Sequence, residues 1–509
     1  MIDKLLFGTM GRILLRLSLI LILSSLLFFI ISKSLRGPIH LWDEALYANN
    51  ALDMVKNHQY LVYTVGDTID HQNTKPPLVL WMEAAAGASL GFSELSVRLP
   101  TYLALVGLLV LLCVYLRRFT GSILPGLLAS LFCLTTMGLI RHHVFLTGDL
   151  DGVLVFWTTW ITLHWIYCLR KEAVESVDYV VLTTLFCAGY FTKSTAVLLI
   201  VPSLFCIGCF YWRRFWTLVA SRRTGYSILV FSALCTAYYL VREHYDPGYW
   251  AIVWWSEFSR LSEDVQPWLH YKSSFYFERF YDPLFQEYLL LLAALMIPFL
   301  IVRRCEAKRL VLALLSGALV YLLFISFPPV KLEWYDAPIY PLLCSSMALI
   351  IWELVIGGLS IPSVWRLTAV FALVIVVGIT VKNSFLRVAK EMADEPHSSY
   401  AYQTIPDALK IFHDRYPQVR SFKVLTPPTP KRYAHQLDEL TFYKTIYEYY
   451  EGKTVKVSDL PSSFGIGDTL ICNREVLAQI EKEYRTVRLD STAGGAMWVF
   501  LASAQQDGL

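Results

Sequence analysis

Long apolar runs constrain the fold of this chain more than any other feature of its sequence. Of 509 residues, 56% are hydrophobic and only 17% are charged, whereas soluble domains carry about a quarter charged residues. The apolar runs are long enough to cross a bilayer as helices, so the chain is predicted to be a polytopic α-helical membrane protein. About eleven spans are expected, at residues 13–31, 98–116, 122–140, 151–169, 178–192, 195–212, 226–242, 287–302, 309–327, 337–356 and 363–381.

Basic clusters orient these predicted spans. They fall in loops on a single side, which the positive-inside rule makes cytoplasmic, together with the N-terminus. The clusters are Arg117-Arg118, Arg170-Lys171, Arg213-Arg214 and Arg303-Arg304. These arginines also explain the net charge of +3, which therefore gives no argument for a nucleic-acid partner. We expect a multi-pass protein of the cell (inner) membrane, in contact with its lipids. Its extracytoplasmic loops would be residues 33–97, 141–150, 243–286 and 328–336.

The composition changes after the last predicted span. Residues 1–382 are predicted to form a transmembrane domain, and residues 383–509 a small extracytoplasmic α/β domain of ordinary soluble composition. Periodicity predicts the elements of this tail. Helices are expected at 405–416, 440–450 and 476–484, and strands at 421–425, 469–472, 487–489 and 496–501.

The first long outer loop begins with an acidic pair, Asp43-Glu44. A helix is predicted over Asp43–Asn57, with Asp43, Tyr47 and Asn50 on one face. The dipole and free N–H groups at a helix start favour an ionised carboxylate, which is the form that accepts a proton from a hydroxyl. Asp43 and Glu44 are therefore candidate catalytic residues, and Tyr47 is a candidate substrate contact. The alternative is an ordinary acidic helix start.

Lys75 stands directly before two prolines that predict a second helix, Pro76–Leu90. Proline holds the preceding residue extended and suits the first turn of a helix. A cation at a helix N-terminus is unfavourable unless an anion is also present, so Lys75 and the free N–H groups are candidates for a phosphate site. The alternative is a lysine that reaches the lipid head groups.

More polar residues lie on the same predicted side of the membrane. The candidate substrate contacts among them are Arg141, Asp149, Asp151, Lys331 and Tyr335. Acidic residues at a span boundary are costly unless they are paired or functional. Asp43, Asp149 and Asp151 are candidates to bind a sugar hydroxyl or a divalent cation, Mg²⁺ or Mn²⁺. The sequence itself establishes no cofactor.

Taken in order, these motifs resemble the GT-C membrane glycosyltransferases. The nearest branch is the protein O-mannosyltransferase family (glycosyltransferase family 39) with its relatives, the lipid A aminoarabinose transferases. The resemblance covers most of residues 10–382. It rests on Asp43-Glu44, Lys75-Pro76-Pro77, Arg98-Leu99-Pro100, Asp151 (or Asp149), Lys331, Tyr335, Pro338 and Pro341, with Glu257, Arg260 and His270 in the long aromatic loop.

The resemblance implies transfer of a hexose or pentose from a polyprenyl phosphate to a hydroxyl acceptor on the extracytoplasmic face, with inversion. The acceptor would be a lipid, a glycan or a protein. Asp43 would be the general base, while Lys75 and Lys331 would bind the donor phosphate. Relatives often have an arginine where this chain has Leu46, so a phosphate or acceptor contact is either missing or supplied by another group, such as Arg98 or Arg141.

Two other classes of function compete with this interpretation. A membrane transporter or lipid flippase usually has paired repeats and charges near the bilayer midplane, and the sequence shows neither. A membrane scaffold whose tail recruits envelope enzymes leaves the charged residues of the outer loops unexplained.

Overall fold

The computed structural model describes most of the chain. The described residues are 9–40, 42–66, 68–258, 270–301, 305–356, 363–393, 405, 408–410, 415–426, 438–459, 466–482, 484–491 and 496–504. Arg260, one of the residues of the predicted family pattern, lies outside them. Contacts divide the chain into a first compact unit, residues 1–32, 71–82 and 98–391, and a second unit, residues 33–70, 83–97 and 392–509.

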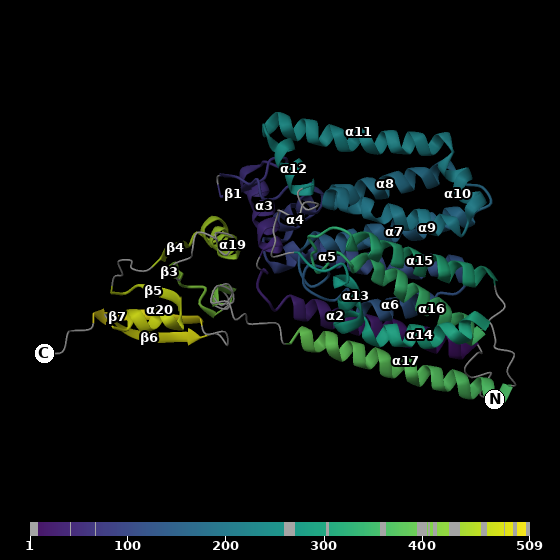
Figure 1. Ribbon diagram of the computed structural model, residues 1–509. Helices are drawn as coiled ribbons and strands as arrows, with labels where there is room; N and C mark the ends of the chain where they lie inside the picture. Colours follow the sequence, from purple (N-terminus) through teal and green to yellow (C-terminus); the bar gives the residue numbers. More distant parts are fainter. Residues whose placement is uncertain are drawn as a thin grey trace. The chain divides into compact units, whose positions relative to one another are not determined.

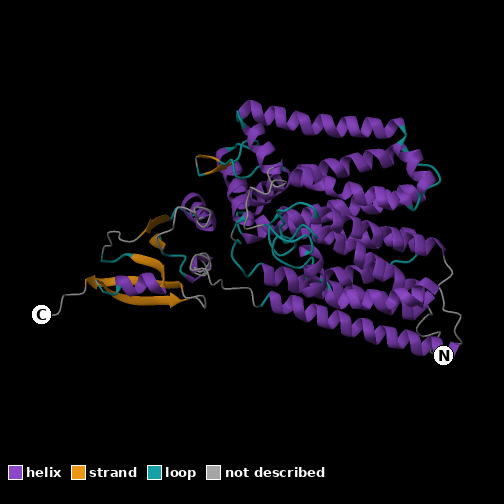
Figure 2. Cartoon of the chain, viewed as in Figure 1, coloured by secondary structure: helices purple, strands orange, loops and turns teal. Residues whose placement is uncertain are grey.

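The first unit is a bundle of helices (Figures 1 and 2). Its elements are α2 (Thr9–Ser34), α5 (Glu94–Thr120), α6 (Leu124–Leu134), α7 (Leu150–Arg170), α8 (Ser176–Lys193), η1 (Ser194–Ile200), α9 (Val201–Cys209), α10 (Trp212–Val219), α11 (Arg222–Tyr245), α12 (Tyr249–Phe258), α13 (Phe275–Arg279), η4 (Phe280–Leu284), α14 (Gln286–Ile301), α15 (Cys305–Ser326), η5 (Ala337–Ile339), α16 (Tyr340–Ile356) and α17 (Ser363–Glu391). The helix α4 (Leu78–Leu90) begins in this unit and ends in the second.

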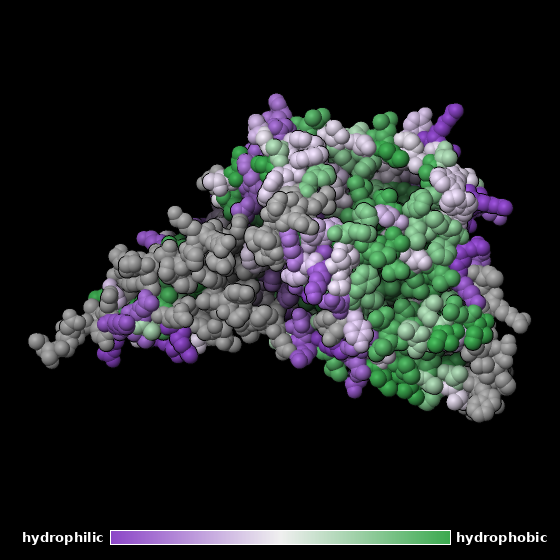
Figure 3. Space-filling view, viewed as in Figure 1, coloured by the Kyte–Doolittle hydropathy of each residue, from purple (hydrophilic) through white to green (hydrophobic). Residues whose placement is uncertain are grey.

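The helices of the bundle have the length and composition of membrane spans. Within the described residues, eight are long and apolar enough to cross a bilayer, and α4, α6 and α14 are shorter apolar helices. The apolar windows of α2 and α17 are only 6% buried, so their side chains face outward. Figure 3 shows the resulting broad hydrophobic surface over the bundle. These features confirm the predicted polytopic helical fold.

Three predicted spans differ in detail from the structure. The one predicted over 122–140 is helical only to Leu134, and beyond the helix the Thr136 hydroxyl bonds to the Leu284 carbonyl at 3.2 Å. The spans predicted over 178–192 and 195–212 form one apolar stretch that reverses at Ser194, where φ is +53°. The reversal brings Val197 against Gly189, leaving no room for a Cβ there.

The bundle has two chemically different ends. The Lys75 end comprises the segments 71–77, 135–151, 193–195, 246–258 and 270–284, with 327–340. The arginine-rich end comprises 117–124, 170–176 and 209–223. A 27-residue helix, α5, joins them, since Arg98 lies near its start and Arg117 and Arg118 lie in its last turn. Figure 1 shows α12 and α13 at one end of the bundle and α10 at the other.

The second unit contains a mixed β-sheet. Its strands are β3 (Ser421–Thr426), β4 (Thr454–Asp459), β5 (Thr469–Asn473), β6 (Tyr484–Ser491) and β7 (Ala496–Ala504), in the order β4-β3-β5-β7-β6. The pairs of β3 with β4 and β5 are parallel, whereas β7 pairs antiparallel with β5 and β6. The helices α19 (Asp438–Thr445) and α20 (Arg474–Ile480) connect strands, and α20 packs on a core of Leu425, Leu470, Cys472 and Val499. The predicted α/β tail is confirmed, although β4 was not predicted.

The same unit includes the predicted juxtamembrane helix α3 (Asp43–Asn57) and the hairpin of β1 (Thr64–Val65) and β2 (Thr68–Ile69). Tyr443 of α19 accepts a hydrogen bond from the Ile39 amide at 3.0 Å and donates one to Glu94 at 2.7 Å. The ammonium of Lys410 lies 3.3 Å from Glu94. These contacts group segments before residue 98 with the tail, whereas the sequence assigned them to a domain ending at residue 382.

Candidate active site

The position of the Lys75 side chain is fixed by partners from several segments. Its amide donates to the side chain of Asn73 at 3.0 Å, a local bond that fixes the extended backbone ahead of α4. Its ammonium lies 2.6 Å from Glu257 of α12, and both side chains are 12% exposed. The other carboxylate oxygen of Glu257 accepts a 2.6 Å hydrogen bond from Thr195. Three segments far apart in sequence therefore hold this lysine in one position.

Additional bonds attach the segment before α4 to α12. The Tyr249 hydroxyl donates to the Thr74 carbonyl at 3.1 Å, and the hydroxyls of Thr74 and Ser256 are 3.2 Å apart. Asp246, just before α12, lies 2.9 Å from His71 and 3.1 Å from the buried Arg242. The aromatic segment 246–258 thus positions Lys75, which is a structural reason for the length of the loop that contains it.

Asp151 and Lys193 form a second acid–base pair at this end. Lys193 ends α8 and donates to Asp151 in the first turn of α7, and both residues are almost fully buried. The Lys193 ammonium also lies 5.4 Å from the ring centroid of Tyr335, a cation–π distance. A buried ion needs a partner of opposite charge, so the turn at Ser194 places the lysine where Asp151 is compensated. The predicted residues Asp151 and Tyr335 therefore come together around Lys193.

Asp149 has a different set of contacts. Its carboxylate accepts a hydrogen bond from Thr147 and lies 3.2 Å from the His143 ring. That ring stacks on Trp334, with centroids 3.8 Å apart. The Thr101 hydroxyl donates to the Asp149 carbonyl at 3.3 Å, which ties α5 to the start of α7. Asp149 is thus part of the same end as Asp151, but its partner is a histidine and not a lysine.

Arg141 completes a third pair. Its guanidinium donates to Asp336, which is fully buried and also accepts a 2.7 Å hydrogen bond from Tyr340. Arg141 itself is 8% exposed. Because removing either partner would strand the other charge inside the protein, we expect this pair to be structural as well as electrostatic.

Lys331 differs from the other three cations. It is 2% exposed, and its ammonium donates to the carbonyls of Tyr271 at 3.0 Å and Pro328 at 2.6 Å. Within the described residues no carboxylate lies within ion-pair distance of it. Burial lowers the pKa of Lys331 below its usual value. This lysine holds the segment after α15 against the aromatic loop, and its ammonium is bonded to backbone carbonyls and not to a carboxylate.

The acidic pair that opens α3 lies in the second unit. Glu44 is buried and accepts a 2.6 Å hydrogen bond from the His40 amide, so it caps the chain entering the helix. Asp43 is half-buried, and no hydrogen bond or ion pair within the described part of the chain engages its carboxylate. Trp42 before it has φ of +75°, which is strained for a bulky residue. The backbone is therefore held in a costly conformation directly beside Asp43.

The remaining predicted residues are buried helical positions. Tyr47 lies in α3 at 5% exposure and Arg98 in α5 at 2%. Asn50 of α3 bonds to Asp70 at 2.9 Å, which fixes the hairpin after the helix. Asp43 belongs to the second unit, while Asp149 and Asp151 belong to the first, and a Mg²⁺ or Mn²⁺ site among the three stays a prediction.

Sequence reasoning missed several partners of these residues. Thr195, Asp336, Asp246 and Trp334 were not candidates, and Glu257 entered only through the family pattern. A lone acid in an aromatic loop, such as Asp246, has no periodic signal. Asp336 could have been proposed from the sequence, because a second charged residue near Lys331 in a loop between two spans usually has a structural or functional role.

Comparisons with known proteins find similarity in sequence and in fold. Residues 74–241 match the family model described as dolichyl-phosphate-mannose-protein mannosyltransferase. The fold is similar to that of ArnT from Cupriavidus metallidurans bound to undecaprenyl phosphate, with a TM-score of 0.61 at 12% identity over 96% of this chain and 98% of that one. The apo state of the same protein gives a TM-score of 0.56 at 13% identity, covering 95% and 98%. No curated protein sequence matches the chain.

The shared fold is a bundle of apolar helices together with a small α/β domain. The family match, over about a third of the chain, and the fold together support a membrane glycosyltransferase. Neither supports the transporter or flippase alternative.

Proposed function

We propose that this protein transfers a hexose or pentose from a polyprenyl-phosphate donor to a hydroxyl of a lipid, glycan or protein at the extracytoplasmic face of the cell membrane. The observation that carries the proposal is the fixed ammonium of Lys75, held by Glu257 and Thr195 at the end of the bundle that also contains Lys193, Arg141 and Lys331. Several cations on one end of an apolar bundle suit a lipid-linked phosphate.

In this reaction the acceptor oxygen attacks the anomeric carbon, and the bond from that carbon to the phosphate oxygen breaks. The polyprenyl phosphate leaves with the electron pair, and a cation that neutralises it lowers the barrier. Lys75 supplies that charge, and Glu257 is a positioning residue that orients it. A single displacement inverts the anomeric centre.

The acceptor proton passes to a base, for which Asp43 is the candidate. Its carboxylate accepts no hydrogen bond within the described residues and opens α3, where the helix dipole favours the ionised form. Glu44 is less suited to this role, because it caps the amide of His40.

The test is a turnover assay with purified full-length protein in lipid and a panel of undecaprenyl-phosphate sugars. Released undecaprenyl phosphate is measured by mass spectrometry with mixed lipid, glycan and peptide acceptors. Asp43→Asn should reduce release by about 10² to 10⁴-fold, the usual contribution of a general base. Glu172→Gln, an exposed acid at the arginine-rich end, should leave it unchanged. Full turnover by folded Asp43→Asn protein would rule out the assigned base.

A further inference from the structure

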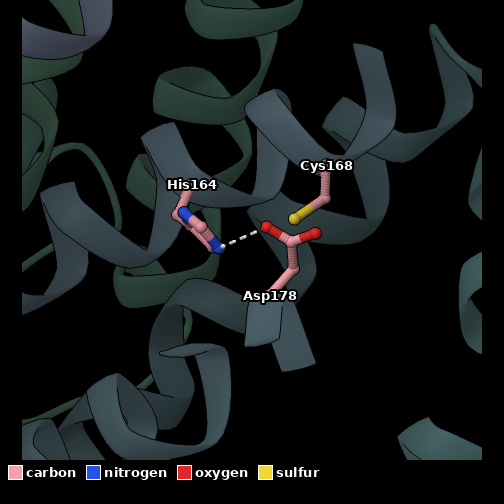
Figure 4. A group of neighbouring side chains, drawn as sticks. All are labelled: His164, Cys168 and Asp178. Atoms are coloured by element: carbon pink, nitrogen blue, oxygen red, sulfur yellow. Dashed lines mark ion pairs between the residues drawn. The ribbon is translucent and has the colours of Figure 1, made fainter. Parts of the chain in front are cut away.

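A second group of chemically reactive side chains lies at the arginine-rich end. No residue of this end has a role in the proposed transfer reaction. His164 and Cys168 are one helical turn apart on α7, and Asp178 is in the first turn of α8. Figure 4 shows the Asp178 carboxylate between the imidazole and the thiol. All three residues are buried, and one donor atom from each lies within 4.8 Å of the other two. We infer that these residues form a binding site for a thiophilic divalent cation, Zn²⁺ in the first place.

The donor set favours zinc over the hard cations. Zn²⁺ binds thiolate, imidazole and carboxylate groups in tetrahedral geometry, whereas Mg²⁺ and Ca²⁺ require oxygen ligands. Three protein ligands leave the fourth position for a water molecule. On binding, the Cys168 thiol releases its proton to water, because the thiolate is the metal ligand.

The imidazole of His164 is oriented for a ligand at its outer nitrogen. Nδ1 lies 2.7 Å from the Tyr115 hydroxyl, which in turn accepts a hydrogen bond from Trp160 at 3.3 Å. Nε2 is buried and has no hydrogen-bond partner within the described residues; the nearest Asp178 oxygen is 3.8 Å away. A histidine whose second nitrogen is bonded by an outer partner is the usual arrangement in metal sites. A cation between Nε2 and the carboxylate would satisfy both.

Asp178 is likewise held in place by outer contacts. Its carboxylate accepts the Glu175 amide at 2.9 Å and lies 2.9 Å from the Lys171 ammonium. The Lys171 ammonium therefore compensates the carboxylate when no metal is bound. Lys171 lies beyond the end of α7 and its side chain is 22% exposed, so it can turn into water when a divalent cation takes its place.

The test uses the full-length protein in detergent, freed of metal with a chelator and titrated with Co²⁺. One equivalent should bind with a thiolate-to-cobalt charge-transfer band, and Zn²⁺ should displace it. Cys168→Ser should abolish the band, whereas Cys209→Ser, an exposed cysteine of the same end, should retain it. Tyr115→Phe should weaken binding by about 10 to 100-fold, as loss of an outer partner does.

X-ray absorption of the zinc-loaded wild-type protein should show one sulfur ligand and nitrogen or oxygen ligands, a result that does not depend on any variant folding. Absence of stoichiometric Co²⁺ binding to folded wild-type protein would overturn the inference. A band that persists in Cys168→Ser would overturn it too, because the thiolate would then come from another cysteine.

Discussion

Most cations at the two ends of the helical bundle have different kinds of partner; Lys171, which contacts Asp178 at the arginine-rich end, is the exception. At the Lys75 end, Lys75, Lys193 and Arg141 each contact a carboxylate from a distant segment. At the arginine-rich end, Arg214 and Arg223 donate to the carbonyls of residues 172 and 174. The arginines there also lie over aromatic rings, as Arg118 does over Tyr115 and Tyr167.

This difference in partners distinguishes a site in which the fold positions each charge from basic residues that only orient the protein in the membrane. Burying a charge is costly unless it is paired, so buried pairs drawn from three or four segments must be specified by the fold. An arginine at a membrane boundary keeps its head group near water and needs no acid. We therefore expect substitutions of cations to affect activity or stability strongly at the first end and weakly at the second.

The largest expected effect is on Lys75. Lys75→Met should reduce kcat/KM for sugar transfer by about 10³-fold, because a preorganised charge next to the leaving group is lost. The matched control is Arg214→Met at the arginine-rich end, which should change it less than about twofold, since exposed positions contribute little. Steady-state release of the polyprenyl phosphate measures both. Comparable losses of kcat/KM in the two variants would contradict the expected difference between the two ends.

Asp336 should show the next largest effect, this time on stability. Asp336→Asn leaves the buried Arg141 guanidinium uncompensated, which should lower the free energy of unfolding by about 3 kcal/mol. Thermal unfolding in detergent measures the change. Glu333→Gln breaks the neighbouring pair with Arg279, whose acid is 55% exposed, and should cost less than about 1 kcal/mol. Equal destabilisation by the two variants would contradict the assignment of Arg141 and Asp336 as a buried structural pair.

Local patterns in the sequence predicted the elements well and the contacts poorly. The limits of α3, Asp43–Asn57, agree with the prediction, and α4 begins two residues after Pro76. The carboxylate that fixes Lys75 lies 182 residues away in sequence, and helical periodicity contains no information at that separation. The family pattern alone pointed to Glu257.

The missed strand has a different cause. In β4 the residues Val455 and Val457 alternate with polar neighbours, which is the period-2 signal of a half-buried strand. The signal was present but short, and it follows directly after the helical segment that ends at Tyr450. The shortened α6 is the reverse case, because the apolar run continues to Ile140 while the helix ends at Leu134.

Substitution of Glu257 should have a moderate effect on kcat. It compares a positioning residue with Lys75, which acts on the donor directly. It positions Lys75 and Thr195 but is not expected to touch the donor, so Glu257→Gln should reduce kcat by about tenfold, within the range for an outer-contact residue. The amide oxygen can still accept from Lys75, whereas the amide NH2 can only donate to the Thr195 hydroxyl, and the charge is lost. Glu257→Asp, which restores the charge on a shorter side chain, should recover part of the activity. The pH dependence of kcat in both variants separates this role from direct proton transfer, because a positioning residue leaves its shape unchanged.

Substitution of Lys331 should have the smallest effect, a change in how stability depends on pH. It tests whether this cation of the Lys75 end is shielded from water. Since its folded-state pKa is lowered by burial, the unfolded chain binds more protons between that pKa and the unfolded value of about 10.4. Stability from this residue must therefore rise with pH through this window and level off above it. Lys331→Met should remove that rise, so the difference in unfolding free energy between wild type and variant should grow in favour of wild type as the pH approaches 10.4. A constant difference would mean that Lys331 is solvated like the arginines of the opposite end, and the contrast would then rest on the three acid–base pairs.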